Sequence, residues 1–200
     1  MLCLDFVNSV ERRRSGPPTD RLHGYAGLVS WARAAGVIGD LDAHRLLREA
    51  ARRPSAADFA FRHALGLREA IYRVVSAAAD RRLPRAGDVA ILNGVIAQAG
   101  AAVQLAARDD RLQWTWRRER PALEQPLWLV ARSAAHVLTS SLLATVRQCP
   151  APDCGRLFLD GSRNRTRRWC DMRVCGNRAK ARRHYARRRS SRTRSAGGKS

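Results

Sequence analysis

Four of the five cysteines form two close pairs near the C-terminal end, which limits what this part of the chain can fold into. The pairs are Cys149–Cys154 and Cys170–Cys175, each with four residues between its members, and 15 residues separate the pairs. Two turns that each present two sulfurs, joined by a hairpin-sized spacer, can bring four thiolates to one tetrahedral ion. Four cysteines also close the coordination sphere of that ion. The pattern therefore predicts one structural zinc ion (Zn²⁺) and no catalytic metal.

The other uses of paired cysteines depend on the compartment in which the chain resides. Residues 1–10 have no basic stretch before their apolar part and no cleavage pattern, so we do not expect a signal peptide. The longest apolar run, 127–143, is interrupted by Arg132 and His136, which argues against a membrane span. We therefore expect a cytoplasmic protein with no membrane partner, where disulfides are rare. A redox switch at the zinc thiolates remains an open alternative, and the fifth cysteine, Cys3, is expected to be a small buried apolar residue.

The residues around the cysteine pairs predict the order of a treble-clef-like zinc finger. Residues 156–159 are strand-like and residues 160–164 are rich in turn formers, so the spacer is expected to form a hairpin. Cys175 precedes residues 178–189, in which alanine, arginine and lysine favour a helix. This segment has too few apolar residues to fold alone, so zinc is expected to contribute about 10 kcal/mol or more of folding free energy. Loss of one cysteine should then unfold the module.

The positive charge of the chain is concentrated at the same end. The formal net charge is +21; residues 149–200 hold 16 basic and 3 acidic residues, against 22 and 14 in the first 148. Positive side chains surround the predicted helix, which repels itself unless an anion neutralises it. Duplex DNA carries a dense line of phosphates, which can neutralise the positive charge of such a helix. Most charge runs are solvated faces, but this run has one sign and follows a predicted zinc site, so we favour nucleic acid as the partner, and DNA over RNA.

The side chains expected to contact DNA lie in the spacer and on the helix. They are Arg163, Arg165, Arg167 and Arg168 in and after the spacer loop, and Arg178, Lys180, Arg182, Arg183, His184, Arg187 and Arg188 on the helix. Arginine predominates because its planar fork matches phosphate. Nothing in the pattern says which arginine reads a base.

The first 147 residues are expected to be mainly α-helical with one small β-hairpin, in a domain long enough to bury a core. Two alternating apolar runs, 103–105 and 112–116, flank a polar turn and predict the hairpin. Residues 55–58 have the form of a capping box, and residues 139–141 are expected to bend or split the last helix. Apolar residues at helical spacing predict the helices; the expected ranges are 21–35, 40–53, 55–82, 89–99 and 127–147. Residues 190–200 are expected to be a disordered basic tail.

Polar residues near the N-terminus are the only candidates for a ligand site in this domain. Asp5 and Asn8 stand among apolar residues. We favour a role in capping the first helix, with a small-molecule effector pocket as the alternative. No nucleophile–base pair, acid pair or phosphate loop stands out, so the chain is not expected to be an enzyme.

Several motifs resemble those of a known family. Cys149-Pro150, the run from Cys154 to Asn164, Arg168-Trp-Cys170 and the run from Cys175 to His184 resemble the CGNR zinc finger, whose name residues 175–178 spell. The start, Leu2 to Ser9, resembles the opening of the ABATE domain. One departure is that Gly161 and Arg165 stand where the family has Thr and Gly.

The resemblance covers the chain up to about Arg189 and implies a stress-induced transcription regulator. It implies an ABATE-like sensor or dimerisation domain over 1–147, so that a homodimer is expected as an option, and a CGNR finger over 148–189. It also places the family's ligands at Cys149, Cys154, Cys170 and Cys175. Two functions of other classes stay open: a zinc-stabilised adaptor whose basic helix binds an acidic protein, and an RNA-binding accessory factor. An enzyme in the N-terminal domain is the least favoured.

Overall fold

The computed structural model describes residues 1–11, 13–15, 17, 19–108, 110–117 and 122–196, without the side chains of Arg108 and residues 187–196. The α-helices are α1 (Leu2–Val7), α2 (Gly24–Ala34), α3 (Asp40–Arg52), α4 (Pro54–Ala79), α5 (Ala86–Ala102), α6 (Gln125–Thr139) and α7 (Asn177–Ala196). A 3₁₀ turn, η1 (Ser141–Thr145), and a π turn, η2 (Met172–Gly176), join them. The strands pair as antiparallel hairpins, β1 (Val10–Glu11) with β2 (Thr19–Asp20), β3 (Val103–Arg108) with β4 (Arg111–Trp116), and β5 (Val146–Gln148) with β6 (Leu157–Leu159). The mainly α fold with small hairpins is confirmed.

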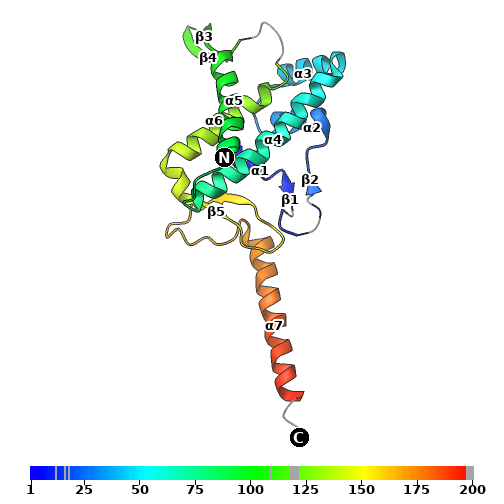
Figure 1. Ribbon diagram of the computed structural model, residues 1–200, viewed down its shortest axis with the longest axis vertical. Coiled ribbons are helices and arrows are strands. Elements are labelled where there is room, and N and C mark those ends of the chain that lie inside the picture. The colour runs from blue at the N-terminus through cyan, green and yellow to red at the C-terminus, as the bar shows by residue number, and fades with distance from the viewer. Residues whose placement is uncertain (12, 16, 18, 109, 118–121, 197–200) are drawn as a thin grey trace.

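The long helix α4 forms the centre of the body, with α1, α2, α3, α5 and α6 packed against it (Figure 1). Its apolar residues recur every three or four positions, and Ala60, Ala64, Leu67 and Ile71 are fully buried. The short helix α1 lies against α4 and α6 and places Phe6 in the core, where its ring packs against that of Trp31 at 4.9 Å between centroids. The N-terminal residues are therefore part of the core and not a loose end.

The helix predictions are correct in position and less so at their ends. Gly36 adopts a positive φ of 69° after α2, as expected of a stop signal. α4 begins at Pro54 with no side-chain cap, so the predicted capping box is wrong and proline at the first turn starts the helix instead. α5 is longer than predicted and runs through Gly100. α6 ends at Thr139, so the predicted split is confirmed, while residues 146–148 form β5 rather than helix.

The predicted β3–β4 hairpin is confirmed with the expected alternation. Its register pairs Val103 with Trp116 and Leu105 with Trp114. The base of the hairpin packs on the body, because the Trp116 ring lies 4.9 Å from that of Trp128. The hairpin itself projects from one end of the molecule (Figure 1).

The β5–β6 hairpin connects the cysteine-rich segment to the body. Val146 and Leu157 belong to the main core cluster, and Leu157 is also held through its backbone by Asn8. The predicted hairpin within the spacer is wrong. β6 pairs instead with β5, which precedes it in the chain, so the first cysteine pair lies in the connection between these two strands. Among the described residues of the spacer, none besides β6 forms a strand, because residues 160–169 fold as a loop around Asp160.

Beyond η2, α7 leaves the body as a single projecting helix (Figure 1). Its backbone stays helical to Ala196, where the sequence predicts a disordered tail from residue 190, and residues 197–200 lie outside the described part of the chain. Among the described residues, no helix combines the length and apolarity needed to cross a membrane.

Candidate metal centre and nucleic-acid surface

The four cysteines that form two pairs in the sequence meet in space. Their sulfur atoms all lie within 4.8 Å of one another, with 3.5 Å between Cys154 and Cys170 and 3.7 Å between Cys170 and Cys175. A tetrahedral zinc–thiolate centre with Zn–S bonds of about 2.3 Å has sulfur–sulfur edges of about 3.8 Å. All five cysteines are free of disulfides. The sulfur positions therefore fit one tetrahedrally bound ion.

The first two ligands are presented by the turn between β5 and β6. The amide of Cys149 donates to the carbonyl of Arg156 at 2.8 Å, and the amide of Cys154 donates to that of Ala151 at 3.0 Å. These bonds close a tight knuckle in which both cysteines are buried with Phe158. Since β5 and β6 are fixed on the body, this half of the site has its own structural support.

Of the other two ligands, Cys170 precedes the π turn η2 that leads into α7, and Cys175 lies within it. The carboxylate of Asp171 accepts from the amide of Val174 at 3.0 Å, and the carbonyl of Asp171 accepts from the amide of Cys175 at the same distance. Asp171 thus shapes the turn that brings Cys175 back towards Cys170. The metal ligand Cys175 therefore lies two residues before the start of α7.

The pKa values of the cysteine thiols indicate that four thiolates at this site need a cation. Burial raises the pKa of Cys175 to about 11, and burial together with the neighbouring sulfurs raises the pKa of Cys170 further. For Cys149, burial is outweighed by backbone hydrogen bonds from Cys170 and Ala151, so its pKa is lowered. Four thiolates cannot be crowded together without a cation to neutralise them. A divalent ion removes this repulsion, which is why metal binding and folding are coupled at such sites.

A buried aspartate that the sequence analysis did not single out organises the spacer loop. The carboxylate of Asp160 accepts from the amide and hydroxyl of Ser162 at 3.0 and 2.5 Å and from the amide of Arg167 at 3.1 Å. The Ser162 hydroxyl, with these amides, lowers the pKa of Asp160. The pattern Asp160-Gly-Ser162 is typical of an Asx turn and could have revealed this role.

The arginines predicted to contact DNA from the spacer have different surroundings. Arg163, Arg165 and Arg168 are exposed, and Arg168 lies 5.7 Å from the ring of Trp169. Arg167 is also exposed, but its guanidinium donates to the carbonyls of Trp169, at 3.0 Å, and Cys170. It also lies over the Phe158 ring at 4.9 Å. Arg167 therefore connects the spacer loop to β6 and to the segment that carries Cys170.

The predicted contact residues on α7 lie on an exposed helix. Lys180, Arg182, Arg183 and His184 are exposed. Arg178 forms an ion pair with Asp153 and so connects the first turn of α7 to the first knuckle. Arg187 and Arg188 continue the helix, but their side chains lie outside the described part of the structure. After Asp171 the chain carries eleven basic and no acidic residues, so no residue of α7 itself offsets its positive charge.

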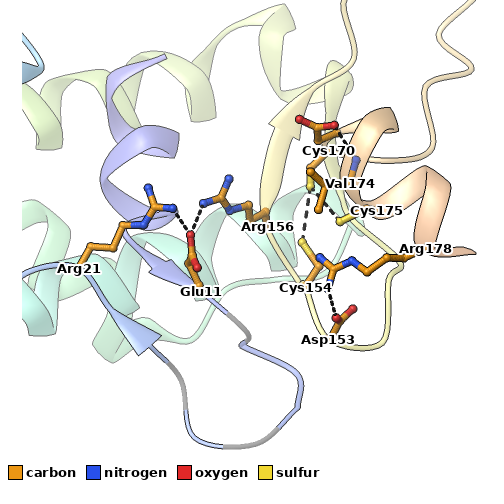
Figure 2. Close-up of a pocket in the computed structure, with 10 residues that line it drawn as sticks. Glu11, Arg21, Asp153, Cys154, Arg156, Cys170, Val174, Cys175 and Arg178 are labelled. Atoms are coloured by element: carbon orange, nitrogen blue, oxygen red, sulfur yellow. Dashed lines mark hydrogen bonds and ion pairs between the residues drawn. The ribbon is translucent and has the colours of Figure 1, made fainter.

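A hollow of about 270 Å³ lies between the finger and the body, and its lining includes Cys154, Cys170 and Cys175 (Figure 2). On the body side, Glu11 accepts from Arg156 at 3.3 Å and from Arg21. Glu11 thus connects β1 to the segment that holds the first two ligands. The sequence offered no signal for this contact, because the partners are 145 residues apart.

The polar residues near the N-terminus form no side-chain cap of α1, although Asn8 is its C-cap residue. Asp5 pairs with the N-terminal amine at 3.2 Å. The side-chain amide of Asn8 donates to the carbonyl of Leu157 at 2.8 Å and accepts from its amide at 3.1 Å. The predicted side-chain capping is therefore wrong, and Asn8 ends α1 through its backbone amide alone, which donates to the carbonyl of Leu4 at 2.9 Å. Both residues do border a hollow of about 300 Å³ with Ser30 and Trp31 of α2, here called the α1–α2 hollow.

The sequence of the body decides the family. Residues 1–141 match the ABATE family, described as "Putative stress-induced transcription regulator". The chain belongs to the ABATE family. In this ABATE protein, residues 145–188 match the CGNR zinc finger, a range that includes all four clustered cysteines. The resemblance seen in the sequence is confirmed, and the cysteines are the ligand set for one structural zinc. A search of curated proteins finds no match to this ABATE protein.

Proposed function

We propose that this ABATE protein is a DNA-binding transcription regulator that uses its zinc finger to present α7 to duplex DNA in the cytoplasm. One observation carries the proposal: a 20-residue helix whose sequence has nine basic and no acidic residues begins two residues after the metal ligand Cys175 and projects from the body. Such a helix is about 30 Å long and suits the major groove of B-DNA, which admits an α-helix.

The charge of α7 supports phosphate as the partner. Lys180, Arg182 and Arg183 have no acidic residue on their own helix to neutralise them. Release of the counterions that condense on DNA favours binding of such a helix and makes the affinity salt-dependent. Exposed Arg163, Arg165 and Arg168 in the spacer add further positive charge.

The proposal predicts that replacing Arg182 and Arg183 by alanine weakens duplex binding without removing zinc. The affinity should fall at least about tenfold, and the slope of log affinity against log salt should become shallower by about 2, because two phosphate contacts are lost. Fluorescence anisotropy with labelled duplex at several salt concentrations measures both quantities, and elemental analysis measures zinc.

A matched variant separates contact from charge. Arg48→Ala with Arg52→Ala removes the same charge from exposed positions on α3 and should leave the salt slope nearly unchanged. Equal losses in both variants, or no loss in the α7 variant, would contradict the role of α7. Binding to an acidic protein or to RNA in preference to any duplex would support the adaptor or the RNA-binding alternative instead.

We propose a binding protein and not an enzyme, because four cysteines leave no open position on the metal for a substrate. The N-terminal domain is proposed to sense a small polar effector in the α1–α2 hollow. Asn8 supports this role, since it borders the hollow and also holds β6. A ligand that binds Asn8 would compete with the hydrogen bonds between Asn8 and β6. Binding in the hollow would therefore affect the strand that supports the zinc finger.

Filling the hollow tests the effector proposal. Ser30 is exposed at its edge, so Ser30→Tyr should occupy the space and leave the core intact. A panel of polar metabolites is screened by thermal shift against the wild type and this variant. A compound that raises the Tm of the wild type by several degrees should have little effect on the variant. Equal shifts in both proteins would place the ligand elsewhere.

A further inference from the structure

We propose that the apolar face of the β3–β4 hairpin is the surface through which two copies of this chain form a dimer. Alternate residues on paired strands point to the same side of a hairpin. By the observed register, one face consists of Val103, Leu105, Ala107, Leu112, Trp114 and Trp116, and the other includes Gln104, Ala106, Arg111, Gln113 and Thr115. The hairpin is therefore amphipathic, as a sheet is when one face is to be covered.

Within the described part of the chain, a single copy covers only the base of the apolar face. Trp116 packs on Trp128, but Leu105 is 53% exposed, Leu112 71% and Trp114 68%. A two-stranded hairpin is at best marginally stable in water unless its apolar face is packed or further strands are added. These three side chains are thus the part of the hairpin that another molecule must cover.

The same surface carries both a projecting group and a space that can receive one. Trp114 borders a hollow of about 190 Å³, here called the hairpin hollow, which α5 lines with Ile96, Ala99 and Gly100. An apolar cavity of about 150 Å³ accepts a benzene ring, so the hairpin hollow has room for one leucine side chain. A twofold interface needs this self-complementarity, because each copy offers the same patch. We assign Leu112 of each copy to the hairpin hollow of the other.

The size of the patch agrees with a second copy as the occupant. The exposed parts of the three side chains amount to roughly 400 Å². Each partner in a stable interface contributes about 800 Å², of which a little over half is apolar. The patch therefore supplies most of the apolar share of one protomer.

The distribution of charge also favours association at this end. A chain with a net charge of +21 repels its own copies, and the hairpin lies at the end of the molecule opposite α7 (Figure 1). Among the residues that form the patch and the hairpin hollow, Arg132 is the only charged one. Two copies that meet through their hairpins can keep their basic helices apart.

Sedimentation equilibrium of the zinc-loaded full chain, without DNA, tests the proposal. The wild type should be a dimer at micromolar concentration. Leu112→Glu places two charges in the interface and should raise the dissociation constant at least about 100-fold. Because Leu112 is largely exposed in one copy, the variant should fold normally, with unchanged zinc content and Tm at concentrations where both proteins are monomeric.

The matched control is Leu41→Glu, an equally exposed leucine on α3 (76%) far from the hairpin in sequence, and it should leave the dimer intact. A monomeric wild type overturns the proposal and assigns the patch to a different protein. A dimer that survives Leu112→Glu, or that Leu41→Glu dissociates equally, also overturns it. Loss of DNA binding in the α7 variant has no bearing on this measurement, so the two proposals fail separately.

Discussion

At the scale of single residues, Arg165 shows how a departure from the family pattern appears in the backbone. It stands where CGNR fingers are expected to have glycine, and its φ is +50°. Its amide donates to the carbonyl of Ser162 at 3.0 Å, which closes the spacer loop. A residue with a Cβ atom is disfavoured in this left-handed region by about 1–2 kcal/mol. The loop therefore has the conformation that glycine favours while carrying an arginine.

This conformation predicts that Arg165→Gly stabilises the finger. The gain in the free energy of unfolding should be up to about 1 kcal/mol, because relief of strain exceeds the entropy that glycine adds to the unfolded chain. Urea unfolding of the zinc-loaded protein without DNA measures it. Arg163→Gly removes the same charge from an exposed position with an ordinary backbone conformation, so it should be neutral or destabilising. A similar gain in both variants would indicate relief of charge repulsion instead.

Residue chemistry alone predicts the metal ligands but not the role of each arginine. Four cysteines with two spacings suffice to predict the zinc site, because few other uses of thiols need that pattern. Arg167 and Arg168 look equivalent in the sequence, yet Arg167 donates to the finger's own carbonyls. Such a contact depends on where the loop returns, which Asp160 decides through bonds that no local pattern of charge reveals.

At the scale of elements, the finger consists of two halves with different support. The β5–β6 hairpin is held by the core through Val146 and Leu157 and by Tyr72, whose hydroxyl donates to the carbonyl of Gly155 at 3.1 Å. The half with Cys170, Cys175 and α7 is joined to the first half by the metal site and by the Arg178–Asp153 ion pair. The sequence-based expectation that the module has too few apolar residues to fold alone did not include the support that the body gives its first half.

This difference predicts a partial effect of Cys175→Ser. The variant should lose zinc and protection of residues 170–186, while β5, β6 and the body stay folded with a Tm within a few degrees of the wild type, since their core is intact. Hydrogen exchange read by mass spectrometry resolves the two regions. Cys3→Ala, a change at the buried fifth cysteine, is the control and should keep zinc. Loss of protection throughout the body in Cys175→Ser would show that the finger supports the whole fold.

Element prediction worked where a periodic pattern was long and did not work where a strand was short. The apolar spacing in α4 and the alternation in β3–β4 extend over enough residues to be recognised. β5 has three residues and continues the helical pattern of α6, so only its pairing with β6 distinguishes it. Ser140, whose hydroxyl accepts from the amide of Leu142, starts the 3₁₀ turn that ends the helical course.

At the scale of the whole molecule, the position where the charge composition of the sequence changes is not the position where the finger separates from the packed core of the body. Charge divides the sequence near Cys149, but Leu157 lies in the core of the body and pairs with Asn8, 149 residues away. Contacts at this sequence separation have no local pattern, so the attachment of the finger could not be predicted. The exposure of the apolar face of β3–β4 could not be predicted either. Alternation in the sequence predicts that a hairpin has one apolar face, but it does not tell whether another part of the same chain covers that face.

The pair of hydrogen bonds between Asn8 and Leu157 has a thermodynamic consequence. It makes one amide a shared boundary between the α1–α2 hollow and the strand that carries the finger. Free-energy coupling between two binding events is reciprocal. Under the proposed function, an effector in the hollow that changes the affinity of α7 for DNA would have its own affinity changed by bound DNA by the same factor. In the proposed function, effector binding at the α1–α2 hollow and DNA binding at α7 would then be linked by one coupling free energy.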